Sequence, residues 1–311
     1  MARFLALIAR IPQAAELVAE LKAATRLSPR KDRAFQADLL ERVFQDAATI
    51  AAGSGWTGRV IVSDGRVLVD RDGALFPVDL SSRFFRNQGD PPGANLLATL
   101  DVLGVRARTI FDLGANIGEL AIYFARRRPE ARVVAFEPAP ENIRRFREIQ
   151  ALQQPPLTNL ELVPEAVSDR TGTIAMTVGA DLLNTTMLEA NLERLSSVRG
   201  MQVTEVPTDT LENFCERLKV RTIDFLKLDL EGGEPQLAAS IRALRGRIGA
   251  AYVEISTFNT LEAYLELVDA FASAGLRLAT KKQWVDAPGP WLQEQLSTGG
   301  LVNVWFARRD G

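Results

Sequence analysis

DFLKLDLEGGE, residues 224–234, combines β-prone, apolar residues with charged side chains that a buried strand rarely carries. In a strand, Lys227, Asp229 and Glu231 would alternate with leucines and therefore point to one face. The pair Gly232–Gly233 allows a tight turn into the next helix. The pattern indicates either a structural network of a lysine with carboxylates or a catalytic site at the end of a strand.

A second motif, FDLGANIGE at residues 111–119, follows another predicted strand and opens a helix. Gly114 and Gly118 let the backbone turn sharply and approach a ligand. Their spacing is Gly-x-x-x-Gly, whereas dinucleotide-binding loops have Gly-x-Gly-x-x-Gly. Because Asp112 would repel a phosphate and attract an amino group, the loop favours a nucleoside that carries an amino acid over a dinucleotide.

The next predicted strand ends in Glu137, about 20 residues beyond the glycine loop, where a carboxylate can accept hydrogen bonds from both ribose hydroxyls. A glutamate at a strand end can also simply be solvated, and a glycine turn can be structural. The order and spacing of the loop and the glutamate favour nucleoside binding.

Strand and helix patterns alternate through most of the chain. Strands are expected at 109–113, 133–137, 160–163, 172–178, 223–230, 250–256, 277–280 and 302–307, and helices at 94–104, 119–128, 140–152, 236–244 and 260–274. This alternation predicts βαβ units and an α/β fold with a mostly parallel sheet covered by helices on both faces.

The N-terminal region has a different pattern. Two helices are expected at 2–24 and 33–52, followed by a β meander whose runs are separated by Asp64-Gly65 and Asp72-Gly73, a strong hairpin signal. We predict a boundary that divides the chain into 1–93 and 94–311. The first part would act as a cap, as a surface for homo-oligomer formation or as a partner-binding region, and its sequence does not decide among these.

Composition excludes several classes of function. The 311 residues contain no histidine and one cysteine, so a Ser-His-Asp triad, a histidine-ligated metal and a cysteine-rich zinc site are all excluded. The net charge of −2 argues against nucleic acid as a partner. The apolar run 4–9 is too short for a membrane span or a signal peptide, and we expect a cytoplasmic protein.

With these motifs placed, the chain resembles the FkbM family of S-adenosylmethionine-dependent methyltransferases over roughly residues 109–256. The segments that carry the resemblance occur in the family's order, and they are FDLGANIGE (111–119), VVAFEPAPEN (133–142), EAVSD (165–169), VPTDTLENF (206–214) and DFLKLDLEGGE (224–234). The resemblance implies a Rossmann-like, seven-stranded class I methyltransferase sheet. S-adenosylmethionine would bind at the carboxyl ends of its strands, with S-adenosylhomocysteine as product.

The resemblance also implies which residues bind S-adenosylmethionine. The glycine loop would hold the methionine portion, Glu137 with the adjoining Pro138 would hold the ribose, and Glu165 and Ala166 would lie near the adenine. The loop residues concerned are Asp112, Gly114, Ala115, Asn116 and Gly118.

Candidate catalytic residues lie at the carboxyl ends of two predicted neighbouring strands. Asp229 is expected beside the methyl group, where it would orient or deprotonate an acceptor hydroxyl. Glu231 would assist or bind a divalent cation through its oxygens. Glu254, alone at the end of the next strand, would line the acceptor pocket or form a buried pair. Lys227, as a neutral amine, is the least favoured candidate for the base.

These residues favour O-methylation, because a hydroxyl acceptor must lose its proton and a placed carboxylate can accept it. Relatives in the family methylate hydroxyls on sugars or polyketide-derived molecules, which implies a glycan or small natural product as acceptor. The alternatives are an inactive binding protein with this fold and, less favoured, an NAD-linked oxidoreductase. Without histidine, activity is expected to persist below pH 6 unless burial strongly raises the pKa of the carboxyl base.

Overall fold

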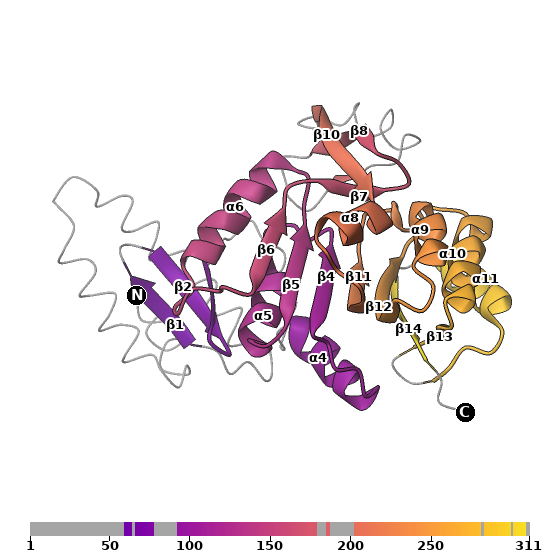
Figure 1. Cartoon of the computed structure of the whole chain (residues 1–311), viewed down its shortest axis with the longest axis horizontal. Coiled ribbons are helices and arrows are strands. Elements are labelled where there is room, and N and C mark those ends of the chain that lie inside the picture. The colour runs from indigo at the N-terminus through magenta and orange to yellow at the C-terminus, as the bar shows by residue number, and fades with distance from the viewer. Residues whose placement is uncertain are drawn as a thin grey trace, which may run out of the picture. The chain divides into compact units, whose positions relative to one another are not determined.

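A computed structural model describes residues 59–63, 66–77, 92–178, 185–186, 202–280, 283–299 and 301–308 (Figure 1). The predicted helices 2–24 and 33–52 lie outside these residues. The chain divides into two compact units, one of residues 1–96 with 151–156 and one of 97–150 with 157–311. In the described part of the chain, no helix is long and apolar enough to cross a membrane. The predicted domain boundary after residue 93 stays a prediction.

In the smaller unit, three strands form the predicted meander: β1 (Arg59–Ser63), β2 (Arg66–Arg71) and β3 (Ala74–Pro77) pair antiparallel in that order. Leu68, Ala74 and Phe76 are buried. The side chain of Gln153 fixes the last strand, because it accepts a hydrogen bond from the Leu75 N–H at 3.1 Å and donates one to the Leu75 carbonyl at 2.6 Å.

In the larger unit, the described residues include a sheet of seven strands in the order β13-β14-β12-β11-β4-β5-β6. The strands are β4 (Thr109–Leu113), β5 (Arg132–Phe136), β6 (Leu160–Val163), β11 (Ile223–Leu228), β12 (Ile248–Ile255), β13 (Arg277–Ala279) and β14 (Val302–Ala307). Neighbouring strands from β6 to β12 are parallel, whereas β14 runs antiparallel to both β12 and β13. The expected α/β fold with a mostly parallel seven-stranded sheet is confirmed.

Aromatic clusters show that helices cover both faces of this sheet. On one face, the Phe136 ring packs against Phe111, with ring centroids 5.2 Å apart, and against Phe214 of helix α8 (Leu211–Arg217), with ring centroids 4.9 Å apart. On the other face, Phe225 packs edge-on against Phe124 of helix α5 (Glu119–Arg127) at 5.8 Å. Because alternate residues of a strand point to opposite faces, these two clusters form separate core layers above and below the sheet.

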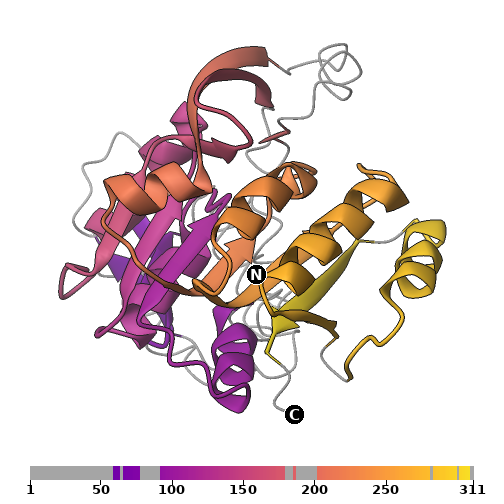
Figure 2. The ribbon, with the colours of Figure 1, turned by 45° about the vertical axis from the view of Figure 1, so that its right-hand side comes forward.

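Most of the remaining helices lie close to their predicted positions. They are α4 (Pro92–Val102), α6 (Pro140–Ala151), the short 3-10 helix η2 (Glu234–Leu237), α9 (Ala238–Ala243), α10 (Leu261–Ser273) and α11 (Pro288–Ser297). Figure 2 shows α9 and α10 packed side by side along the C-terminal half of the sheet. Helices α8 and α11 were not predicted, because each is short and the first turn of α11 contains two residues, Pro288 and Pro290, that are rare inside helices.

A second, smaller sheet stands beyond the carboxyl ends of the main strands. It contains β7 (Ala166–Ser168), β8 (Gly172–Val178), β9 (Thr185–Thr186) and β10 (Gln202–Thr210) in the order β7-β10-β8-β9. β10 is the central element, since it pairs parallel with β7 and antiparallel with β8. This sheet lies near the candidate site because β7 follows β6 after a short turn.

One strand boundary corrects the sequence interpretation. β11 ends at Leu228, so Asp229 and Glu231 lie in the turn that follows the strand and not in the strand itself. Glu231 has a φ of 51°, which is left-handed backbone that a strand does not contain. Asp229 still reaches the buried Lys227, whose Nζ atom lies 3.2 Å from its Oδ2 atom, whereas Glu231 lies in the left-handed part of the turn.

The aromatic layer predicts how strongly the fold depends on one side chain. Phe136→Ala removes a fully buried ring that contacts both Phe111 and Phe214. We expect the free energy of unfolding, measured by urea denaturation, to fall by about 3–5 kcal/mol. Val203→Ala is the control, because Val203 is 51% exposed and its truncation should change stability by less than about 0.5 kcal/mol. Equal losses in the two variants would contradict the assignment.

Candidate functional site

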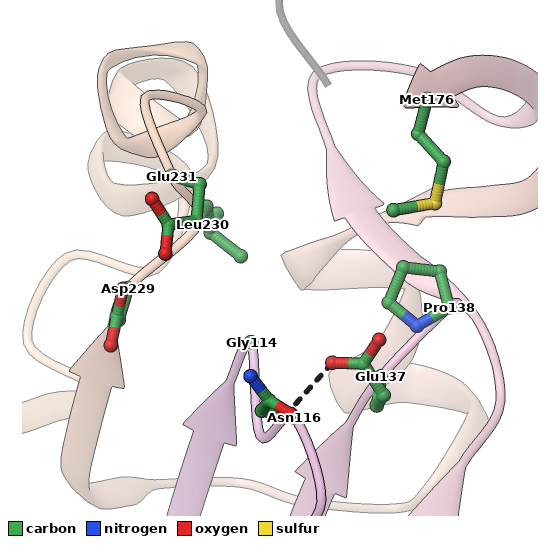
Figure 3. A pocket seen from close by; sticks show the side chains of 8 residues that line it. All are labelled: Gly114, Asn116, Glu137, Pro138, Met176, Asp229, Leu230 and Glu231. Carbon is green, nitrogen blue, oxygen red and sulfur yellow. Dashed lines mark hydrogen bonds between the residues drawn. The ribbon is translucent and has the colours of Figure 1, made fainter. Parts of the chain in front are cut away.

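A pocket opens at the carboxyl ends of β4, β5 and β11, where ligands bind in sheets of this kind. It contains about 480 Å³ of space not occupied by protein atoms, open at one side. Figure 3 shows its two walls, which meet at Gly114 and Asn116. The residues that line it are Gly114, Asn116, Glu137, Pro138, Met176, Asp229, Leu230 and Glu231.

The glycine loop lies directly against the turn that follows β11. Gly114 has a φ of +74°, and a Cβ atom there would lie 1.8 Å from the backbone oxygen of Asp229. No rearrangement of a side chain could relieve that overlap, because the obstacle is backbone. Glycine at 114 therefore lets the two loops pack backbone to backbone at the floor of the pocket.

The rest of the loop turns into helix α5. The N–H groups of Gly114 and Ala115 both donate to the Phe136 carbonyl, at 3.1 and 3.0 Å, and Asn116 has a φ of 52°. Gly118 begins the helix, and a Cβ atom there would lie 2.6 Å from the ring of Phe146. Of these residues, Gly114 and Asn116 reach the pocket, whereas Ala115 and Gly118 support the loop from below.

Glu137 is buried and fixed by three donors. Its Oε2 atom accepts the Asn116 N–H at 2.9 Å, and its Oε1 atom accepts the Ala139 N–H at 2.9 Å and the Asn142 side-chain amide at 3.2 Å. Burial raises the pKa of Glu137 to about 7, although these hydrogen bonds oppose the rise. The carboxyl group thus joins the loop after β4 to the loop after β5, and it still lines the pocket (Figure 3).

Lys227 is the centre of a buried ionic network. Its Nζ atom lies 3.2 Å from Asp112 Oδ1 and 3.2 Å from Asp229 Oδ2, and it donates to the Gly114 carbonyl at 2.9 Å. Burial alone would lower the pKa of Lys227, but the carboxylates of Asp112 and Asp229 outweigh burial and raise it. These ion pairs favour the charged form of Lys227, so a role as a neutral-amine base gains no support.

The same network corrects the expectation for Asp112. Strand register places Asp112 directly opposite Lys227, and the Asp112 side chain is fully buried. Its carboxylate pairs with Lys227 and does not line the pocket. The sequence motif suggested an amino group of a ligand as the partner of Asp112, whereas the structure supplies that ammonium group from the neighbouring strand.

Carboxyl groups gather on the other side of the pocket. Burial, with repulsion from Asp229 and Glu234, raises the pKa of Glu231 to about 7. Burial and repulsion from Asp229, Glu231 and Glu234 raise the pKa of Glu254 to about 8. Glu254 does not line the pocket, and its influence on the site is electrostatic. This wall therefore contains a carboxyl group, Glu231, that changes protonation near neutral pH.

Two residues expected near the adenine do not line this pocket, and two unpredicted residues do. Glu165 forms a two-bond ion pair with Arg217, and Ala166 is buried in β7, so their place near the adenine stays a prediction. Met176 of β8 and Leu230 do line the pocket. Leu230 belonged to the motif but looked like core. The sequence offers no signal for Met176, because only the tertiary fold brings β8 to this pocket.

The pocket fits S-adenosylmethionine in its chemistry. A narrow backbone floor at Gly114, a carboxyl group at the end of β5 and an apolar wall of Pro138 and Met176 suit an amino acid, a ribose and a purine respectively. Among the described residues, no three histidine, cysteine, aspartate or glutamate side chains come together in a way that could hold a metal ion. A divalent cation at Glu231 therefore gains no support.

Comparison with known proteins identifies the family. The model of the methyltransferase FkbM domain matches residues 112–278, just over half of the chain. The chain belongs to the FkbM methyltransferase family. It is accordingly a methyltransferase that uses S-adenosylmethionine, and no observation favours an NAD-linked oxidoreductase or an inactive binding protein.

Individual relatives are distant. The chain is 26% identical over 215 residues to the 2-O-methyltransferase NoeI of Sinorhizobium fredii. The aligned region covers 65% of this chain and 86% of NoeI. Among solved structures, the methyltransferase FkbM of Methylobacillus flagellatus is 13% identical with a TM-score of 0.41, over 94% of this chain and 59% of that one. Fibrillarin of Aeropyrum pernix is 15% identical with a TM-score of 0.38, over 81% and 100% of the two chains.

The floor of the pocket provides a test of cofactor binding. Gly114→Ala forces a Cβ atom onto the Asp229 carbonyl, so we expect the Kd for S-adenosylmethionine, measured by calorimetry, to rise about tenfold or more. Gly246→Ala is the matched control, because Gly246 has nearly the same φ, +76°, with no atom within 4 Å of the added Cβ. Similar affinity losses in both variants would show that backbone strain alone, and not the contact between the loops, is responsible.

Proposed function

We propose that this protein transfers a methyl group from S-adenosylmethionine to a hydroxyl group of a sugar, a glycan or a small natural product. The observation that carries the proposal is the position of Asp229 and Glu231, two carboxyl side chains on the wall opposite the glutamate that ends β5 (Figure 3). A hydroxyl acceptor needs such a group to orient it and remove its proton. The family relative NoeI is named as a 2-O-methyltransferase, which agrees with an oxygen acceptor.

Bound S-adenosylmethionine supplies a methyl group that is already activated by the positive charge on sulfur. Gly114 and Asn116 would hold the methionine portion at the pocket floor. Glu137 would accept a hydrogen bond from a ribose hydroxyl, in addition to the hydrogen bonds that it accepts from the protein. Pro138 and Met176 would contact the adenine. Water exclusion and alignment are the main contributions left to the protein.

The structure supports different roles for Asp229 and Glu231, the two carboxyl residues on this wall of the pocket. Asp229 is an ion-pair partner of Lys227, so its charge is compensated and its position is fixed; it suits an orienting role. Glu231 reaches the same pocket, and the rise in its pKa to about 7 suits a general base at neutral pH. We therefore assign proton removal to Glu231 and orientation of the acceptor to Asp229, where the sequence alone favoured Asp229 as base.

A polyhydroxyl acceptor matches this wall better than an isolated alcohol. Asp229 and Glu231 are separated by one residue and both face the pocket, so their oxygens can accept hydrogen bonds from neighbouring hydroxyls. One hydroxyl would then be held while the adjacent one is deprotonated. Glu254 would act from outside the contact surface through its charge.

Binding and transfer measurements test these roles. Calorimetry should show binding of S-adenosylmethionine and S-adenosylhomocysteine but not NAD. Glu231→Gln and Asp229→Asn should each keep the affinity for S-adenosylmethionine within about threefold, while kcat for transfer falls about 10²–10⁴-fold in the Glu231 variant, as for loss of a general base. Loss of cofactor binding in either variant would move that residue from the acceptor side to the cofactor site.

The pH profile follows from the assignment of Glu231. A carboxyl group accepts a proton only in its ionised form, which is depleted below its pKa of about 7. We therefore expect kcat to fall about tenfold per pH unit below pH 7. The sequence predicted activity below pH 6 provided that the carboxyl base has an ordinary pKa. Because burial raises the pKa of Glu231, that prediction does not apply to Glu231. A kcat that stays constant down to pH 5.5 would contradict Glu231 as the base.

A further inference from the structure

The turn at residues 229–233 carries two unusual backbone conformations in succession. Glu231 has a φ of 51° and Gly232 a φ of 101°. A glutamate rarely adopts left-handed backbone, and it persists there only where surrounding contacts determine it. Because Asp229, Leu230 and Glu231 all line the pocket, the conformation of this turn decides where the carboxylates of the site point.

Glu234 holds the turn from the inside. Its Oε1 atom accepts the Leu230 N–H at 2.6 Å and the Gly232 N–H at 3.3 Å. The side chain is only 1% exposed and does not line the pocket. These two N–H groups lie on either side of Glu231, so one carboxylate oxygen of Glu234 fixes the backbone on both sides of the residue assigned as the base.

Asn259 holds the same turn from the other side. Its side-chain amide donates to the Gly232 carbonyl at 2.8 Å and lies 3.4 Å from the Tyr264 hydroxyl. That hydroxyl in turn accepts the Ser256 N–H at 2.9 Å, and Tyr264 is fully buried in α10. The Gly232 N–H thus donates to Glu234, and the Gly232 carbonyl accepts from Asn259 in the loop that follows β12.

We propose that Glu234 and Asn259 are positioning residues of the transfer reaction, which hold the 229–233 turn so that the Glu231 carboxylate faces the acceptor. The inference rests on the proposed function for the role of Glu231. Neither residue touches the pocket, so both act through the turn. Their removal should therefore affect kcat and leave cofactor affinity nearly unchanged, since the floor at Gly114 and the opposite wall at Glu137 are not bonded to them.

A glutamine at 234 distinguishes the two effects of Glu234. Its amide oxygen can accept the same two N–H groups, but it lacks the negative charge that helps to raise the pKa of Glu231. Glu234→Gln should therefore keep kcat close to that of wild type at high pH, and it should shift the acid limb of the pH profile of kcat to lower pH. A residue that only stabilises the fold would not move that limb.

The experiment uses the full chain with S-adenosylmethionine labelled in its methyl group. The acceptor panel contains methyl glycosides of common hexoses, an amino sugar and a thiol, so that an acceptor other than a hydroxyl is also detected. We expect Glu234→Leu and Asn259→Ala to lower kcat about 30-fold or more, with the Km for S-adenosylmethionine within about threefold of wild type. Glu234→Gln should remain within about threefold in kcat at pH 8.5. Glu262→Gln, an exposed carboxylate on α10, is the charge control and should match wild type.

Several outcomes would overturn the inference. They are an unchanged kcat in both Glu234→Leu and Asn259→Ala, a loss of cofactor affinity that equals the loss of kcat, or a Glu234→Gln variant as inactive as the leucine variant. If Glu234→Leu does not fold, Asn259→Ala decides by the same criterion.

Amide hydrogen exchange separates this inference from the proposed function. With S-adenosylhomocysteine bound, the Leu230 and Gly232 amides should exchange faster in Glu234→Leu, or in Asn259→Ala for Gly232, than in wild type, whether or not an acceptor is found. Unchanged exchange contradicts the inference. Transfer to the amino sugar nitrogen or the thiol, with no transfer to hydroxyls, contradicts the proposed function and leaves the positioning role to be decided by kcat on that acceptor.

Discussion

The ammonium group of Lys227 is the interaction on which the site depends. It sits under the pocket floor between Asp112 and Asp229 and donates to the Gly114 carbonyl. An unpaired ammonium at this depth would be strongly unfavourable, and so would the buried Asp112 carboxylate without it. One side chain therefore connects the strand before the glycine loop, the loop itself and the turn that carries Asp229 and Glu231. The floor of the pocket and the wall at Asp229 share this one ionic contact.

Close backbone packing also holds the loops at the pocket floor together. The overlap that a Cβ on Gly114 would make with the Asp229 carbonyl shows that the two loops meet through backbone atoms. Glu137 provides the equivalent connection on the other side, because it joins the loops after β4 and β5. Backbone contacts and hydrogen bonds thus hold the floor of the pocket on both sides. Fixed placement of this kind suits a reaction whose donor is already reactive, because the protein then contributes mainly alignment.

Local patterns were sufficient to predict the seven strands of the main sheet and insufficient to predict the partners of the charged residues. The strands of TIFDL and LELV were predicted to the residue, because each is a short apolar run bounded by clear breaks. The sequence could not show that Lys227 neutralises Asp112, since that contact arises from the register between β11 and β4. For the same reason it could not show that Asp229 is paired, that Glu231 lies in a left-handed turn, or that Met176 faces the pocket. Family resemblance identified the family, whereas the place it implies for Glu165 and Ala166 near the adenine stays a prediction.

The pocket takes its walls from two different sheets. The floor and the carboxylates belong to the main sheet, whereas Met176 belongs to the small sheet organised by β10. Pairing of β8 with β10 uses backbone hydrogen bonds, which tolerate many side chains. Substitutions in the small sheet can therefore reshape the upper wall of the pocket while the ionic contact below it stays intact. The side chain at position 176 can therefore change the size and polarity of this wall without altering a contact of Lys227.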